Sequence, residues 1–296
     1  MIYKKFSLFD VAIYAIMGLV LLLAAYPLYF TVIASVSKAE YVLRGEVWLL
    51  PKGLNVQAYQ NVFSNSKIWL GYYNSLINTF LGTLVNLIVN IPCAYVLSKK
   101  RLLGRNFLMM IFTFTMYFGG GMIPNFLLMK SLGMIDTRWA LIICFPLNVY
   151  NMIVARTYYS SSIPEEIYES CRIDGANEYT VFARIAIPLS KPILAVLTLY
   201  FAMGHWNSYF NALIYVNRQE LFPLQLVLRN ILILNEQMAI SDEMTGKDMA
   251  VMAERQNVVE AMKYALIFFA SAPVLIIYPF FQKYFVKGVM IGAIKG

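Results

Sequence analysis

The stretch LGYYNSLINTFLGTLVNLIVNIPCAYVLS, residues 70–98, decides the fold class of this chain. It contains no Asp, Glu, Lys or Arg, and it is longer than the roughly 20 mainly apolar residues that a helix needs to cross a bilayer. The whole chain is similar, since 60% of its 296 residues are hydrophobic and only 14% are charged. A soluble domain carries about a quarter charged residues, so the composition predicts an all-α integral membrane protein.

Six segments have the length and composition of transmembrane helices. Six spans place both termini on the same side of the membrane. Lysine and arginine are denser in the segments on that side, and SKKRLLGR at residues 98–105 is the clearest basic anchor, which predicts cytoplasmic termini in a multi-pass protein of the cell membrane. The predicted spans are residues 11–34, 70–98, 107–129, 139–159, 192–214 and 264–282.

The remaining composition argues against several other functions. The net charge of +8 does not indicate nucleic-acid binding, because the basic residues lie at the ends of apolar segments and no run of five occurs. The three cysteines form no C-x-x-C pair, and a single histidine leaves no metal-ligand cluster. The sequence has neither a G-x-x-x-x-G-K-[ST] phosphate loop nor a G-x-S-x-G motif, so we expect no ATPase or other catalytic site in this chain.

Small and polar residues recur at steps of four along the second predicted span. Such a stripe must face protein or water, because an unpaired amide in hydrocarbon is costly. Two interpretations remain open: contacts between helices of the bundle, or one wall of a transport pathway. The residues are Asn74, Asn78, Gly82, Asn86 and Asn90.

Two further spans carry unusual residues. FGGGMIPNF, residues 118–126, predicts a bend or break in the third span, because glycine and proline both interrupt helices. MGHWNSYFNAL, residues 203–213, combines aromatic rings with amides, a mixture that suits the C–H patches and hydroxyls of a sugar but also the aromatic belt at a membrane interface. The candidate pathway residues here are His205, Trp206, Asn207, Tyr209 and Asn211.

The stretch EEIYESCRIDGANEYTVFARIAIPL, residues 165–189, interrupts the apolar sequence with charge. Ser162 stands three residues before Glu165, which predicts a capping box at the start of a short helix. Gly175 is expected to end that helix, and Asn177 to cap a second helix that Pro188 and Pro192 end. The sequence therefore predicts a helix pair in a cytoplasmic loop of about residues 161–190, between the fourth and fifth spans.

The spacing in this loop resembles the EAA motif of membrane subunits of ATP-binding-cassette importers. That motif has an E-A-A triplet, a glycine after three residues, and I-x-L-P nine residues later. Glu169 starts the triplet and Gly175 is the glycine, whereas IAIP ends the pattern with isoleucine in place of leucine. Ser-Cys replaces Ala-Ala in the triplet, but the D-G-A core is intact. By this resemblance the ATPase contact comprises Glu165, Glu166, Glu169, Ser170, Cys171, Asp174, Gly175, Ala176, Phe182 and Pro188.

Over nearly the whole chain, including SLGMIDTRWALI and SSIPEEIYES, the sequence is similar to the carbohydrate branch of this family, in particular to the second permease subunit of maltose-like and oligo- or polysaccharide importers. The resemblance implies a permease that moves an oligosaccharide inward by alternating access and binds no cofactor itself, because ATP and Mg are bound by a partner ATPase dimer. The other implied partners are a second homologous permease in a heterodimer, an extracytoplasmic solute-binding protein and membrane lipid.

Two alternatives differ from this interpretation. One is a secondary transporter driven by ions or protons; such carriers place a carboxylate at mid-membrane, and none lies in the six predicted spans. The other is a permease of an ATP-binding-cassette importer for a substrate that is not a sugar.

Overall fold

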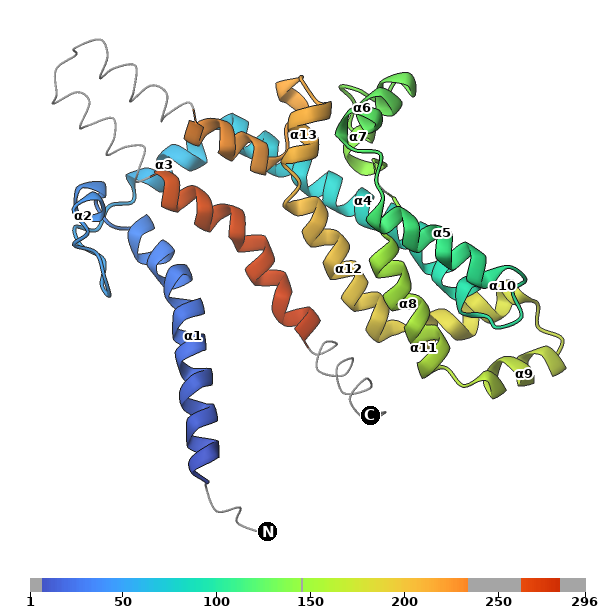
Figure 1. The fold of residues 1–296 in the computed structure, drawn as a ribbon. Helices are drawn as coiled ribbons and strands as arrows, with labels where there is room; N and C mark the ends of the chain where they lie inside the picture. Colours follow the sequence, from blue (N-terminus) through green and yellow to red (C-terminus); the bar gives the residue numbers. More distant parts are fainter. Residues whose placement is uncertain (1–6, 145, 234–261, 283–296) are drawn as a thin grey trace. The chain divides into compact units, whose positions relative to one another are not determined.

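The computed structural model describes residues 7–144, 146–233 and 262–282, and the regular elements in these residues are all helical (Figure 1). The two chain ends therefore lie outside the described residues. The chain forms two compact units, which are Met1–Ile68 with Leu228–Ala272 and Trp69–Val227 with Pro273–Gly296.

The first unit contains α1 (Leu8–Ser35), α2 (Ala39–Leu43) and α3 (Gln57–Ser64). A capping box starts α1, since the Ser7 side chain accepts from the Phe9 amide at 3.4 Å and Asp10 accepts from the Ser7 amide at 3.0 Å. The most apolar window of α1 has no residue buried within the chain.

The second unit carries a longer series of helices around α4 (Ser66–Ser98). In Figure 1, α6, α7 and α13 gather beside α4, and α9 and α10 lie near its C-terminal end. The series is α5 (Arg105–Tyr117), α6 (Met122–Ser131), α7 (Trp139–Ile142), α8 (Val149–Ser162), α9 (Glu165–Ile173), α10 (Glu178–Val181), the π-helical turn η1 (Phe182–Ala186), α11 (Ile187–Leu189), α12 (Lys191–Trp206), α13 (Phe210–Tyr215) and the 3-10 turn η2 (Gln219–Leu221).

Three predicted spans correspond to continuous helices. Residues 11–34 lie in α1, residues 70–98 lie in α4, and residues 264–282 lie in the helix Met262–Gln282. In the described part of the chain these three helices are long and apolar enough to cross a membrane, and the number rises to five if each of two bent helix pairs is one span.

The other three predicted spans, residues 107–129, 139–159 and 192–214, are interrupted. A bend or break was expected within residues 107–129, whereas the interruptions of residues 139–159 and 192–214 were not predicted. The axes of α5 and α6 differ by 109°. Residues 143–148 separate α7 from α8, and residues 207–209 separate α12 from α13.

Local chemistry explains each break. The third span breaks at its glycines as expected, since Gly121 has φ of 86°, a left-handed conformation that favours glycine. The break before α8 contains Pro146, which has no N–H to donate, and it ends where the Asn148 side chain accepts from the Asn151 amide at 3.0 Å. Asn207 ends α12, and asparagine competes with helical hydrogen bonding through its own side chain.

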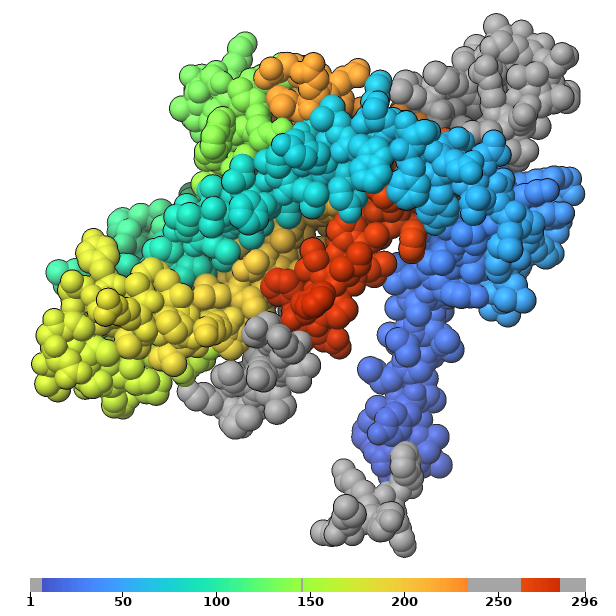
Figure 2. Space-filling model, turned by 180° about the vertical axis from the view of Figure 1, so that it is seen from behind, coloured from blue at the N-terminus to red at the C-terminus, as the bar shows by residue number. Residues whose placement is uncertain are grey.

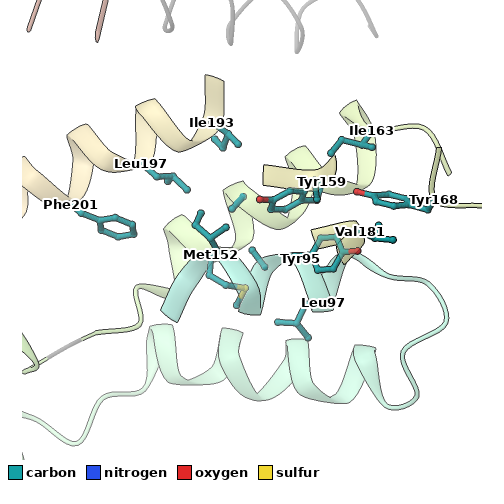
Figure 3. Packing of buried hydrophobic residues seen from close by; sticks show 14 residues of the cluster. Tyr95, Leu97, Met152, Tyr159, Ile163, Tyr168, Val181, Ile193, Leu197 and Phe201 are labelled. Atoms are coloured by element: carbon teal, nitrogen blue, oxygen red, sulfur yellow. The ribbon is translucent and has the colours of Figure 1, made fainter. Parts of the chain in front are cut away.

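A buried cluster joins α4, α8, α9, α10 and α12 (Figure 3). Ile193, Leu197 and Phe201 are spaced four residues apart and line one face of α12. Met152 of α8 is fully buried in the same cluster. Close packing of these side chains holds the helices together, and the cluster fixes the helices on which the charged loop is mounted.

Candidate functional site

The first helix of the charged loop, α9, begins differently from the prediction. Ser162 is the last residue of α8, and Pro164, with φ of −58° and ψ of 143°, is the N-cap of α9 without a side-chain cap bond. The predicted capping box is therefore wrong, because the serine is already part of the preceding helix. Glu165 and Glu166 in the first turn still complement the positive end of the helix dipole.

Gly175 ends α9 as predicted. Its φ is 76°, its amide donates to the Arg172 carbonyl at 3.0 Å, and the Ala176 amide donates to the Cys171 carbonyl at 2.9 Å. These two bonds form a Schellman motif, in which a left-handed residue directs the chain away from the helix axis. The turn therefore sets the direction of the second helix.

The second helix starts at the predicted cap and ends between the two prolines, Pro188 and Pro192, that were predicted to end it. The Asn177 side chain accepts from the Thr180 amide at 2.8 Å. Pro188 lies inside α11, and the helix continues to Leu189, where it bends by 81° into α12. The π-helical turn η1 immediately precedes this proline, so the wider turn accommodates a residue that cannot donate a helical hydrogen bond.

Tyr95, near the end of α4, connects the spanning helix to both loop helices. Its ring centre lies 6.1 Å from that of Tyr168 in α9 (Figure 3). It lies 4.9 Å from the ring centre of Phe182 in η1. Tyr159 of α8 packs edge-on against the Tyr95 ring at 5.7 Å, and the Tyr95 hydroxyl donates to Glu178 at 3.2 Å. A displacement of the loop therefore acts directly on α4 and α8, because close-packed side chains transmit strain.

Charge on the loop is partly paired internally. The Arg172 guanidinium lies 3.9 Å from Glu165 and 3.6 Å from Glu178. Burial raises the pKa of the Tyr168 hydroxyl above the ordinary tyrosine value.

The predicted ATPase-contact residues divide into an exposed and an inward-facing set. Cys171, Ala176 and Phe182 are partly buried against the cluster. Two exposed residues that sequence reasoning missed are Ile173 and Tyr179, whose exposed fractions are 87% and 86%. The sequence could have indicated these two residues, because each is an apolar residue outside the apolar face of its helix. The surface of the charged loop is the yellow-green part of the chain in Figure 2. The exposed members of the predicted set are Glu165, Glu166, Glu169, Ser170, Asp174, Gly175 and Pro188.

The polar stripe of α4 is buried and binds loops of the same unit. At one end the Asn74 amide donates to the carbonyls of Glu220 at 2.7 Å and Phe222 at 3.1 Å. Arg138 donates to the side-chain oxygens of Asn74 at 2.8 Å and Asn78 at 3.3 Å. These hydrogen bonds hold the α6–α7 connection, and η2 with the residue that follows it, against the spanning helix, which favours the helix-contact interpretation of this end of the stripe.

The other end of the stripe binds the break before α8. Asn86 and Asn90 both donate to the Pro146 carbonyl at 2.8 Å, and Asn90 accepts from the Asn148 amide at 3.0 Å. Because its amide nitrogen is directed at Pro146, Asn86 presents its oxygen to His205 Nε2 at 2.7 Å, so that ring nitrogen carries the proton.

Replacing Asn90 with leucine should lower the thermal unfolding midpoint of the purified complex. The amide is fully buried and makes three hydrogen bonds, and its loss leaves the Asn148 amide unpaired. We expect a cost of about 1–2 kcal/mol. Asn125→Leu is the matched control, because this half-buried α6 asparagine has no side-chain hydrogen bond in the described residues. Equal thermal unfolding midpoints for the two variants would show that the hydrogen bonds of Asn90 do not stabilise the complex.

The remaining candidate pathway residues differ in exposure. Trp206 is buried and packs edge-on against Tyr72 with ring centres 5.5 Å apart. Asn207 and Tyr209 are exposed at the break after α12, and Asn211 is half-buried. Trp206 also lines an apolar cavity of about 350 Å³ between α4, α12 and the residues that follow Pro273. A role of any of these residues in the pathway stays a prediction.

Residues 68–291 match the family described as binding-protein-dependent transport system inner membrane component. The chain belongs to this family. The binding-protein-dependent permeases are multi-pass proteins of the inner membrane, and the ATPase of their transport systems is a separate component. Membership confirms the resemblance found in the charged loop and establishes an ATPase and a solute-binding protein as partners.

Two curated relatives and one solved structure are similar over nearly the full length. The polygalacturonan/rhamnogalacturonan transport system permease protein YtcP of Bacillus subtilis (strain 168) is 38% identical, with 99% of this permease and 100% of the relative covered. Protein LplC of the same organism is 37% identical over 99% and 97%. A crystal structure of a bacterial ABC transporter involved in the import of the acidic polysaccharide alginate contains a chain that is 35% identical, with a TM-score of 0.83 and coverage of 95% and 99%.

Proposed function

We propose that this permease forms one half of the membrane channel through which an ATP-driven importer takes up oligosaccharides, and that its substrates are fragments of acidic polysaccharides. The observation that carries the proposal is the full-length similarity to a permease named for polygalacturonan and to a chain of an alginate importer. Both polymers consist of sugar acids. More distant relatives, 25–26% identical, include permeases named for arabino- and galacto-oligosaccharides, so neutral oligosaccharides are the second candidate.

In the proposed assembly the chain crosses the membrane six times with cytoplasmic termini. It pairs with a second, homologous permease subunit, and an ATPase dimer docks on the loop of about residues 161–190 between the fourth and fifth spans. The chain itself binds no cofactor, because ATP and Mg are held by the ATPase. The broken third, fourth and fifth spans fit this assembly, since irregular backbone at membrane depth is tolerated where protein or a water-filled pathway surrounds it.

The packing of the loop supports its proposed role in coupling. Movement of α9 and η1 by the ATPase would reach α4 and α8 through Tyr95 and its three aromatic neighbours. A rigid-body change of this kind switches the bundle between inward- and outward-facing states.

The substrate class is tested by uptake into liposomes that contain the complete importer and its binding protein. We expect ATP-dependent uptake of labelled oligogalacturonides at least about tenfold faster than uptake of arabino-oligosaccharides of the same length, because a site built to bind carboxylates leaves its polar groups unpaired with a neutral sugar. Preference for the neutral sugars would reject the acidic substrate class and leave the permease role intact. ATP-independent uptake driven by an ion gradient would reject the importer mechanism.

A further inference from the structure

A cavity of about 280 Å³ lies where the end of α4 meets the end of α8 and the start of α9. It is more polar than the apolar cavity beside Trp206, since hydroxyl, ammonium and carboxylate groups line it. Glu165 also belongs to the predicted ATPase contact, and Tyr159 and Tyr168 to the aromatic packing around Tyr95, but neither role assigns a ligand to the cavity itself. Its lining includes Ser98, Lys99, Tyr159, Ser160, Glu165 and Tyr168.

Among the groups that line this cavity, the ammonium of Lys99 is unusual. Its Nζ atom is buried and has no hydrogen-bond partner in the described residues. It lies 2.9 Å from the ring centre of Tyr168 and 4.3 Å from that of Tyr95. The two rings hold the cation by cation–π attraction but supply no hydrogen-bond acceptor and no full negative charge.

The carboxylates near Lys99 are engaged elsewhere. Arg172 lies within 4.0 Å of both Glu165 and Glu178, whereas no carboxylate among the described residues is that close to Lys99. Burial lowers the pKa of Lys99 to about 8, so the side chain is charged at pH 7 and only partly compensated. The titratable groups that face it are Tyr95 of α4, Glu165, Tyr168, Cys171 and Arg172 of α9, and Glu178 of α10.

The turn after α4 adds further positive charge at the edge of the cavity. Lys100 also lines the cavity and, like Arg101, is exposed and makes no ion pair in the described residues. Leu103 in the same turn has an exposed fraction of 93%. An exposed leucine next to cations, at the end of a spanning helix, is typical of a segment at the lipid headgroup layer.

We propose that this cavity binds a phosphate group, with the Lys99 ammonium as its buried counter-ion and Lys100 at its rim. A phosphate oxygen accepts the hydrogen bonds that the ammonium lacks, and a charge-assisted bond of this kind is stronger than a neutral one. The group can come from the headgroup of an anionic phospholipid or from free phosphate. The inference does not depend on the transported substrate.

The site should lose affinity as the pH rises above about 8. In the empty site Lys99 is protonated below its pKa of about 8, and a bound anion stabilises the charged form and raises that pKa. Binding is therefore strongest below pH 8 and declines above it. A phosphodiester keeps one negative charge throughout this range, so the decline reports Lys99 rather than the ligand. Lys99→Arg keeps its charge and should bind equally at pH 7 and pH 9.

The experiment measures binding of short-chain phosphatidylglycerol and, separately, of inorganic phosphate to the assembled importer in neutral detergent. We expect at least one of these probes to bind wild type about tenfold more tightly than Lys99→Met, because one charge-assisted hydrogen bond is lost. Lys191→Met is the control, since this exposed lysine starts α12 and does not line the cavity.

Selective binding of phosphatidylglycerol assigns the site to lipid, and comparable binding of inorganic phosphate assigns it to free phosphate. Equal affinities of wild type and Lys99→Met for both probes would overturn the proposal. If Lys99→Met does not assemble, the pH dependence of wild type against Lys99→Arg decides, and two flat profiles would also overturn the proposal.

Discussion

Replacing Gly82 with alanine should sharply reduce the amount of assembled importer in the membrane. A Cβ atom at Gly82 would overlap the imidazole of His205, and even ring atom Nδ1 would lie only 2.6 Å from it. The ring has little freedom to move, because Nε2 is bonded to Asn86 at 2.7 Å and Asn86 is itself bonded to Pro146. Overpacking of this kind costs about 1–3 kcal/mol, a large share of the stability of a typical protein.

The measurement is the yield of complex after detergent extraction, together with its thermal unfolding midpoint. Gly204→Ala is the matched control, because Gly204 also lies in a helix next to His205 and a Cβ there meets nothing within 4 Å. That variant should be as stable as wild type or slightly more stable, since alanine favours a helix over glycine by roughly 1 kcal/mol. Equal yields for both variants would show that the importer assembles without the space that Gly82 leaves for the His205 ring.

Much of the fold could be predicted from hydropathy alone. The lengths of α1, α4 and the helix Met262–Gln282 follow from uncharged apolar runs, because a bilayer demands that length. The interruption of residues 139–159 could not be predicted in this way. Hydropathy reports only how apolar a segment is. The break depends instead on Pro146 and on the hydrogen bonds that side-chain amides of α4, about sixty residues earlier in the chain, donate to it.

In the polar stripe and the charged loop, too, the sequence predicts local features of single residues but not their contacts with distant parts of the chain. Period-four spacing predicted that Asn74, Asn86 and Asn90 share a helix face, but only the structure shows that this face binds loops of its own unit. At the loop, the roles of Gly175 and Asn177 followed from local backbone chemistry. The failed capping box at Ser162 depended instead on where the preceding helix ended.

Replacing Gly175 with valine should uncouple ATP hydrolysis from uptake and leave the spanning helices folded. Gly175 has φ of 76°, and non-glycine residues in this left-handed region cost about 1–2 kcal/mol. Nothing lies within 4 Å of a Cβ at this position, so the penalty comes from the backbone alone. Valine should move the backbone to negative φ, break the two bonds of the Schellman motif, and redirect the second loop helix.

The measurement is uptake per ATP hydrolysed by the reconstituted importer, with equal amounts of complex. We expect Gly175→Val to lower this ratio by about tenfold and Gly175→Asn by less than about twofold, because asparagine tolerates the left-handed conformation.

Gly133→Val is a second control with the same backbone demand. Gly133 has φ of 66° and open space around its Cβ position, but it lies in the turn after α6, away from the charged loop. This variant should lower stability without changing the ratio of uptake to hydrolysis. If both valine variants reduce the ratio alike, the effect is a general cost of left-handed strain and Gly175 has no special part in coupling. If only Gly175→Val does, the direction in which the second helix leaves the turn is what transmits the ATPase movement.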